Sequence, residues 1–253
     1  MTRQILVGGV PIGGGAPVVI QSMLNTKTTD VEGSLRQIRA LAAAGCQVAR
    51  LAVPNREAAR GFAEICKESP LPLVADIHFD YQLAIAAAEG GASKIRINPG
   101  NIGGEDRVKA VVEVCKNKHI PIRIGVNGGS LDKRLLEKYG HPTAEALVES
   151  AFEHLELLEK QGFYDTCVSM KSSTVPTMVA AARLFRSKCD YPLHIGVTET
   201  GPVKQGLIKS AMGIGALLLD GIGDTIRVSL TDDPVQEVYA AKDILKAAGL
   251  RKE

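Results

Sequence analysis

The sequence predicts an α/β protein that folds as a (β/α)8 TIM barrel with a short N-terminal hairpin. Three observations favour this fold. The chain has 253 residues, a length that α/β barrels commonly reach as one domain. From residue 18 onward, apolar strand-like runs alternate with helix-like patterns, with little sequence between them. This alternation occurs eight times, whereas a doubly wound sheet usually has fewer strands. We therefore expect residues 1–253 to form one barrel domain.

Residues 4–17 are expected to form the hairpin. Gly8–Pro11 and Gly13–Gly15 are turn signals between short apolar pieces. A phosphate-binding loop is the alternative, but these glycines lack a following Gly-Lys-Ser/Thr and a helix start. We therefore predict that the hairpin plugs one end of the barrel.

Strands and helices follow in strict order. We expect strands at 18–23, 46–53, 71–77, 94–99, 121–127, 165–171, 192–198 and 225–231. Helices are expected at 31–44, 55–68, 80–89, 105–118, 143–160, 175–189, 203–219 and 233–248. Several end signals support these bounds: Asp30 and Asp233 as N-caps, Pro234 at a first helical position, and Gly45, Gly90 and Gly162 just past C-termini.

The composition excludes several classes of protein. A net charge of +2 gives no reason to expect a nucleic-acid or membrane surface. The sequence has no run of 18 apolar residues and no signal-peptide pattern, so we expect a cytoplasmic protein. Its five cysteines are scattered singly without a Cys-x-x-Cys pair, which argues against a zinc ribbon, a redox dithiol or a disulfide framework.

Polar and apolar side chains alternate along the predicted strands. In the strand at 121–127, Arg123, Gly125 and Asn127 share one face, opposite three aliphatic residues. The polar faces of other strands carry Arg50, Arg96, Asn98, Ser169, Lys171, Arg227, Ser229 and Thr231. In a barrel, the apolar face meets the helices and the polar face points into the lumen. These side chains should therefore gather near the mouth, where the strands end.

Five cations are expected to converge there: Arg50, Arg96, Arg123, Lys171 and Arg227. Asp76 is the only carboxylate of the same kind, and Glu199 stands just past the seventh strand. An enclosed cation without a counter-ion is costly, so an anionic ligand is expected. Arginine binds phosphate oxygens in bidentate fashion, and this number of cations favours a diphosphate. Pairing with carboxylates inside the barrel is the alternative, although helix carboxylates should lie outside.

Other polar residues near the predicted strand ends are open to two interpretations. Backbone N–H groups of Pro99–Gly104 could approach an anion, but an ordinary turn is equally consistent. Asp76, His78 and His194 could bind a metal or act as acid and base. Because no clear third ligand accompanies the two histidines, we expect a substrate hydrogen bond or a satisfied inner histidine and no metal site. His119, His141 and His154 are expected at the surface.

Six segments carry a resemblance to a known family: Val19–Met23, Val74–Asp80, Arg96–Gly103, Pro121–Asn127, Gly196–Glu199 and Gly221–Leu230. They strongly resemble the family of 4-hydroxy-3-methylbut-2-enyl diphosphate synthases of the methylerythritol phosphate isoprenoid pathway. The likeness covers essentially the whole chain, in order.

The resemblance implies a substrate, a reaction and a site. The substrate would be 2-C-methyl-D-erythritol 2,4-cyclodiphosphate, opened with loss of water by two-electron reduction on a [4Fe-4S] cluster fed by flavodoxin or ferredoxin. The five cations would hold the diphosphate, Asn127 and Ser229 would add hydrogen bonds, and Glu199 would help proton transfer. Asp76, His78, Asn98 and His194 remain secondary candidates. Family members work as homodimers.

The sequence departs from the family at its C-terminus. The family continues into a smaller iron–sulfur domain with a Cys-Pro-x-Cys segment, whereas this chain stops at Glu253. We therefore expect an isolated barrel that binds no cluster, binds substrate weakly and does not turn it over. A complete non-redox TIM-barrel enzyme acting on another phosphorylated or pterin-like substrate is the alternative.

Overall fold

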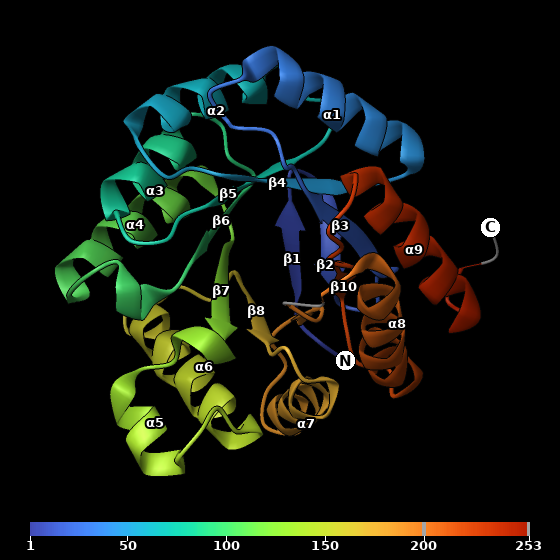
Figure 1. The fold of residues 1–253 in the computed structure, drawn as a ribbon. Coiled ribbons are helices and arrows are strands. Elements are labelled where there is room, and N and C mark those ends of the chain that lie inside the picture. The colour runs from blue at the N-terminus through green and yellow to red at the C-terminus, as the bar shows by residue number, and fades with distance from the viewer. Residues whose placement is uncertain (199–200, 252–253) are drawn as a thin grey trace.

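The computed structural model describes residues 1–198 and 201–251, whose main element is a barrel of parallel strands surrounded by helices (Figure 1). The sheet order is β8-β7-β6-β5-β4-β3-β10-β9. The strands are β3 (Val19–Met23), β4 (Val48–Ala52), β5 (Leu73–Asp76), β6 (Lys94–Ile97), β7 (Ile122–Asn127), β8 (Thr166–Lys171), β9 (His194–Ile195) and β10 (Thr225–Ile226). A bridge between Val168 and Leu193 links the two end strands, so the barrel is nearly closed. The predicted fold class is confirmed.

The helices cover the outside of this sheet (Figure 1). Those that follow the strands are α1 (Val31–Ala44), α2 (Arg56–Glu68), α3 (Tyr81–Glu89), α4 (Glu105–Lys118), α6 (Ala144–Glu159), α7 (Val175–Arg186), α8 (Val203–Leu219) and α9 (Pro234–Ala247). The predicted caps form at Asp30, which accepts the N–H of Gly33 at 2.9 Å, and at Asp233, which accepts that of Val235 at 2.9 Å. Gly45 ends α1 with a left-handed φ of 95°.

The structure corrects three of the sequence-based bounds. A short helix, α5 (Lys133–Tyr139), lies where we expected no helix, and the Asp132 side chain caps it. Strands β9 and β10 contain two residues each, shorter than 192–198 and 225–231. Beyond these two strands, backbone N–H groups bond to side chains and loops and so do not extend the strand pairing. The N–H of Leu230 donates to a Glu237 carboxylate oxygen at 3.1 Å, and that of Thr198 donates to the Ser172 carbonyl at 3.3 Å.

The N-terminal hairpin closes the bottom of the barrel, as predicted. Strands β1 (Gln4–Val7) and β2 (Val10–Gly13) pair antiparallel. Ile5, Val7 and Ile12 are almost completely buried and form one apolar cluster with lumen-facing residues from four barrel strands: Val19, Val48, Val74 and Cys167. Burying side chains of this size contributes about 1.5–3 kcal/mol each. The lumen therefore ends on a hydrophobic floor.

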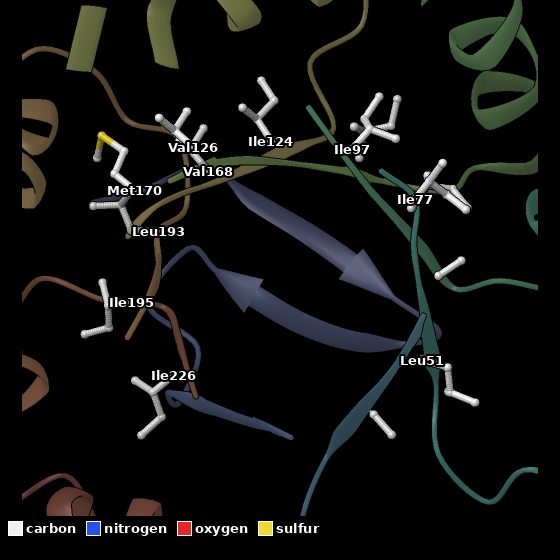
Figure 2. Close-up of a cluster of buried hydrophobic side chains, with 14 of the residues drawn as sticks. Leu51, Ile77, Ile97, Ile124, Val126, Val168, Met170, Leu193, Ile195 and Ile226 are labelled. Atoms are coloured by element: carbon white, nitrogen blue, oxygen red, sulfur yellow. The ribbon is translucent and has the colours of Figure 1, made fainter. Parts of the chain in front are cut away.

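The opposite faces of the strands form the main core. Figure 2 shows aliphatic side chains directed away from the hairpin and toward the surrounding helices, among them Leu51, Ile97, Ile124 and Ile226. This arrangement confirms the predicted alternation, because the residues between them in sequence face the lumen. Along the described part of the chain, no helix has both the length and the apolar character needed to span a membrane.

Candidate functional site

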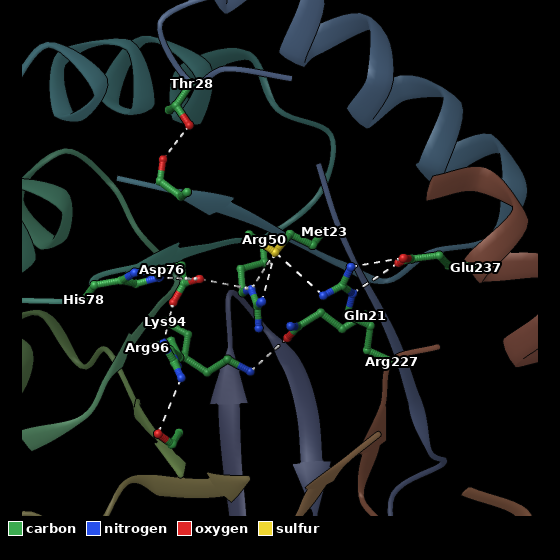
Figure 3. A network of polar contacts seen from close by, with 12 residues as sticks. Gln21, Met23, Thr28, Arg50, Asp76, His78, Lys94, Arg96, Arg227 and Glu237 are labelled. Atoms are coloured by element: carbon green, nitrogen blue, oxygen red, sulfur yellow. Dashed lines mark hydrogen bonds and ion pairs between the residues drawn. The ribbon is translucent and has the colours of Figure 1, made fainter. Parts of the chain in front are cut away.

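Asp76 at the end of β5 holds two arginines at the barrel mouth (Figure 3). The Arg96 Nη1 donates to Asp76 Oδ1 at 3.1 Å, and the Arg50 Nε lies 3.6 Å from Oδ2. Parallel pairing places Asp76 opposite Arg96 and places Arg50 opposite Val74, two residues before Asp76 on β5. Burial alone would raise the pKa of Asp76, but Arg50, His78 and Arg96 outweigh it and hold that pKa well below its usual range. The carboxylate therefore stays ionised and orients both guanidinium groups.

A helix carboxylate occupies the mouth as well, contrary to our expectation. Glu237 on α9 is 3% exposed and accepts from Arg227 through Nη2 at 3.0 Å and Nε at 3.1 Å. Ser22 Oγ donates to the same carboxylate at 2.9 Å. The prediction that helix carboxylates lie outside is wrong for Glu237. Its spacing from Pro234, Val238 and Ala241 places it on the buried face of α9, and this signal was readable in the sequence.

Arg123 and Lys171 remain without a carboxylate. Within the described residues, neither cation has an acidic side chain at ion-pair distance, and the Nε and Nη1 of Arg123 have no hydrogen-bond partner. Both side chains are buried, at 1% and 4% exposure. Burial, followed by the neighbouring arginines, lowers the pKa of each group. Of the five predicted cations, three pair with Asp76 or Glu237, and the other two have no counter-ion among the described residues.

His194 and Lys94 lie deeper in the lumen. His194 was expected to bind substrate or to be a satisfied inner histidine; both ring nitrogens are buried and have no partner among residues 1–198 and 201–251. Burial and then Arg123 lower its pKa well below the usual value, so the imidazole is neutral. Sequence reasoning missed Lys94, although it lies two residues before Arg96 and so shares its face. Its Nζ donates to Gln21 Oε1 at 3.4 Å, and burial lowers its pKa to about 8.

The β6–α4 turn uses Asn98 as a cap. Its side-chain oxygen accepts the N–H of Gly100 at 3.2 Å and contacts the imidazole of His154 on α6. Asn98 Oδ1 therefore caps the 3-10 turn Pro99–Asn101, and the predicted role of Asn98 in the site stays a prediction. His154, expected at the surface, is half-buried, and burial lowers its pKa to about 4.

Gly125 provides the space in which Arg96 lies. A Cβ atom on Gly125 would be 2.3 Å from the Arg96 Nε, closer than real contacts allow. Arg96 Nη2 also donates to the Gly125 carbonyl at 3.4 Å. Along the inward face of β7, Arg123 provides a cation, Gly125 leaves room for Arg96, and Asn127 provides an amide. The absent side chain lets an arginine from β6 extend across β7.

Two cavities open at the mouth and share Asn127. One of about 620 Å³ is lined by hydroxyl groups, including Ser130, Ser172 and Thr198, and by His141. His141, expected at the surface, thus borders the site. The other, of about 200 Å³, is lined by Arg96, Asn98 and His78 among others. His78 is half-exposed and lies 3.3 Å from Asp76 Oδ2.

Ser229 and Glu199 are two further predicted site residues. Ser229 follows β10 at the mouth end of the barrel. Glu199 lies outside the described residues. The described residues do not fit an iron–sulfur cluster, since they include no group of three or more His, Cys, Asp or Glu side chains that could hold a metal. Cys46, Cys115 and Cys167 are buried separately, and burial raises the pKa of Cys46 to about 11.

Comparison with known proteins gives the family and the fold. A family model described as the GcpE TIM-barrel domain matches residues 2–242. The curated 4-hydroxy-3-methylbut-2-en-1-yl diphosphate synthase (flavodoxin) of Maridesulfovibrio salexigens is 56% identical over 251 residues, which cover 99% of this chain and 70% of that protein. The Thermodesulfovibrio yellowstonii protein of the same name is 56% identical over 252 residues, covering 100% and 72%.

Solved structures with the same fold have unrelated sequences at this level of comparison. Dihydropteroate synthase from Stenotrophomonas maltophilia superposes with a TM-score of 0.71 at 14% identity and covers 97% of both chains. The spore coat polysaccharide biosynthesis protein spsE from Bacillus subtilis gives 0.66 at 12% identity, covering 99% of this chain and 75% of the other. Likeness at this identity shows a shared barrel and nothing about activity.

Proposed function

The chain belongs to the GcpE TIM-barrel family, and we propose that its barrel mouth binds 2-C-methyl-D-erythritol 2,4-cyclodiphosphate through the diphosphate. The reaction follows from the family: relatives 56% identical to the chain are 4-hydroxy-3-methylbut-2-en-1-yl diphosphate synthases, Fe–S oxidoreductases of isoprenoid biosynthesis. This chain spans 70% to 72% of the length of those two proteins and corresponds to their barrel portion.

The observation that carries the proposal is that two buried cations, Arg123 and Lys171, have no carboxylate partner among the residues that the structure describes. A diphosphate would neutralise both and accept the N–H bonds that Arg123 leaves unmade. Arg50 and Arg96, held by Asp76, and Arg227, held by Glu237, would face the same anion with their remaining donors. The carboxylates would thus act as positioning residues that fix the arginines before the ligand arrives.

Neutral groups complete the proposed site. Asn127 borders both mouth cavities and would hydrogen-bond the ligand, as would Ser229. His78 lines the smaller cavity and would contact the ligand at the rim. Glu199, by its place just past the seventh predicted strand, would stand near the reacting carbon and assist proton transfer.

We assign no redox step to this barrel, because its described residues do not fit an iron–sulfur cluster. The relatives carry flavodoxin in their names, and we propose flavodoxin or a ferredoxin as the electron donor of this protein too. A [4Fe-4S] cluster would supply the two electrons, and a homodimer would bring a second subunit to the barrel mouth. The pterin-like alternative has no further support, because the likeness to dihydropteroate synthase is 14% in sequence.

Calorimetric titration with the cyclodiphosphate tests the site. Replacing Arg123 by Met keeps an unbranched side chain and removes the charge, and we expect the Kd to rise about 10- to 100-fold. Arg36→Met, at a surface position on α1 whose side chain is 71% exposed, is the matched control and should bind like the wild type. Equal affinities for all three proteins would sink the assignment of the mouth as the diphosphate site.

A further inference from the structure

A second set of polar side chains lies below the mouth, between the arginines and the hydrophobic floor. We call it the lumen layer; its members are Gln21, Lys94, Arg123, His194 and Thr225. Each is at most 1% exposed, although three carry a charge or an imidazole ring. Their neighbours in sequence, such as Ile20, Ile95 and Ile226, pack into the outer core, so the layer faces inward from five strands. Figure 3 shows Lys94 and Gln21 meeting above the hairpin.

Hydrogen-bond donors in the lumen layer outnumber their acceptors. The Nε2 of Gln21, the Nε and Nη1 of Arg123, both ring nitrogens of His194 and the Oγ1 of Thr225 are buried without a partner in the described part of the chain. Within the layer, Lys94 Nζ donates to Gln21 Oε1 at 3.4 Å. This hydrogen bond uses the one amide oxygen of the layer. Buried polar groups in native proteins are almost always satisfied, so something not made of protein is expected here.

The charge of the lumen layer is positive and uncompensated. Lys94 and Arg123 are cations, and the layer contains no carboxylate. Asp76 at the mouth is engaged by Arg50 and Arg96. The thiol of Cys167 on the floor cannot replace it, because burial raises its pKa and keeps it protonated.

We propose that the lumen layer binds a small monovalent anion, such as chloride, beneath the diphosphate site. An anion accepts several N–H and O–H bonds at once, whereas a water molecule also brings two hydrogens into a space already rich in donors. Arg123 has five N–H donors in a planar fork, so it can face this anion and the diphosphate together. The anion keeps Lys94 and Arg123 compensated when no substrate is present. This site goes beyond the proposed function, since it needs neither substrate nor reductant.

Bromide is the direct probe of this site. Crystals of the wild-type chain grown without sulfate or phosphate and soaked in sodium bromide should show an anomalous peak in the lumen, within about 3.5 Å of donors from Lys94, Arg123 and His194. A lumen filled by water alone, with no anomalous peak, overturns the proposal. Because this measurement uses no variant, a folding defect cannot confuse it.

Thermal denaturation at constant ionic strength gives the second test. Replacing sodium gluconate by sodium chloride should raise the unfolding midpoint of the wild type saturably, by about 3 °C at ten times the Kd. Lys94→Met should lose this increment, while Lys109→Met, at an exposed position on α4, should keep it. An increment that is equal in all three proteins contradicts a lumen site. Failure of the cyclodiphosphate to bind would refute the proposed function and leave both halide results unaffected.

Discussion

Glu237 on α9 and Arg227 past β10 form a bidentate ion pair inside the protein, with N···O distances of 3.0 and 3.1 Å. Both side chains are largely buried, at 3% and 15% exposure. The same carboxylate also accepts from Ser22 and from the backbone of Leu230, so it joins β3, the β10–α9 connection and α9. An arginine of the mouth is therefore fixed from the helical layer and not from the sheet.

Replacing Glu237 by Gln should lower the free energy of unfolding by about 3 kcal/mol, because it leaves the Arg227 charge buried without its partner. Urea denaturation followed by circular dichroism measures this change. Glu32→Gln on α1, where the carboxylate is 91% exposed, should change the stability by less than about 0.5 kcal/mol. An equal loss of unfolding free energy in Glu237→Gln and Glu32→Gln would show that the buried ion pair stabilises the protein no more than an exposed carboxylate does.

Adding one methyl group at Gly125 should disturb the mouth. In Gly125→Ala the new Cβ would meet the Arg96 guanidinium at 2.3 Å, so Arg96 must leave its place against Asp76. We expect about tenfold weaker binding of the cyclodiphosphate by calorimetry, equivalent to about 1.4 kcal/mol. Gly104→Ala is the control, because its Cβ would meet nothing within 4 Å and its φ of −66° suits alanine. Unchanged affinity in Gly125→Ala would show that Arg96 need not lie across β7.

The half-buried imidazole of His154 should make stability depend on pH. Burial lowers its pKa from 6.5 to about 4, so the folded state resists the protonation that the unfolded state accepts. The resulting stability is complete above pH 6.5 and is lost as the pH falls toward 4. Between pH 7 and 4 the wild type should lose about 2 kcal/mol more than His154→Gln, measured by urea denaturation at each pH. His119→Asn, at an exposed position, should follow the wild type, and parallel curves for all three proteins would contradict the prediction.

The hairpin floor should contribute strongly to stability. Ile12→Ala removes a completely buried side chain from the cluster under the strands and should cost about 3 kcal/mol. Leu6→Ala lies on the same hairpin, where the leucine is 57% exposed, and should cost less than about 1 kcal/mol. Both values come from urea denaturation. A hairpin that only rests on the barrel would give two small and similar losses.

Strand alternation was the strongest sequence signal. It predicts inward faces for Arg50, Arg96 and Arg123, because period-2 geometry leaves only two faces to choose between. The same rule applied two residues earlier would have found Lys94. The eight-fold order of strands and helices and the hairpin were also predictable, since each follows from local patterns and turn residues.

The partners of these residues were harder to predict. Glu237 and His154 lie on helices, where a charged or polar residue usually faces water. The spacing of Glu237 marks the buried face of α9, but only tertiary packing gives Glu237 and His154 their partners Arg227 and Asn98. The role of Asn98 likewise depends on a turn and a histidine 56 residues away. Sequence patterns therefore assigned faces well, but they could not count the carboxylates that reach the mouth from outside the sheet.

The hairpin closes the lumen at its lower end. Ile5, Val7 and Ile12 cover the bottom of the described barrel, so solvent exchanges with the lumen through the mouth. A diphosphate bound to the arginines would cover the lumen layer and block its exchange with solvent. An ion in the lumen layer must then enter before the substrate and leave after it, so its exchange should be fast in the empty barrel and slow in the loaded one.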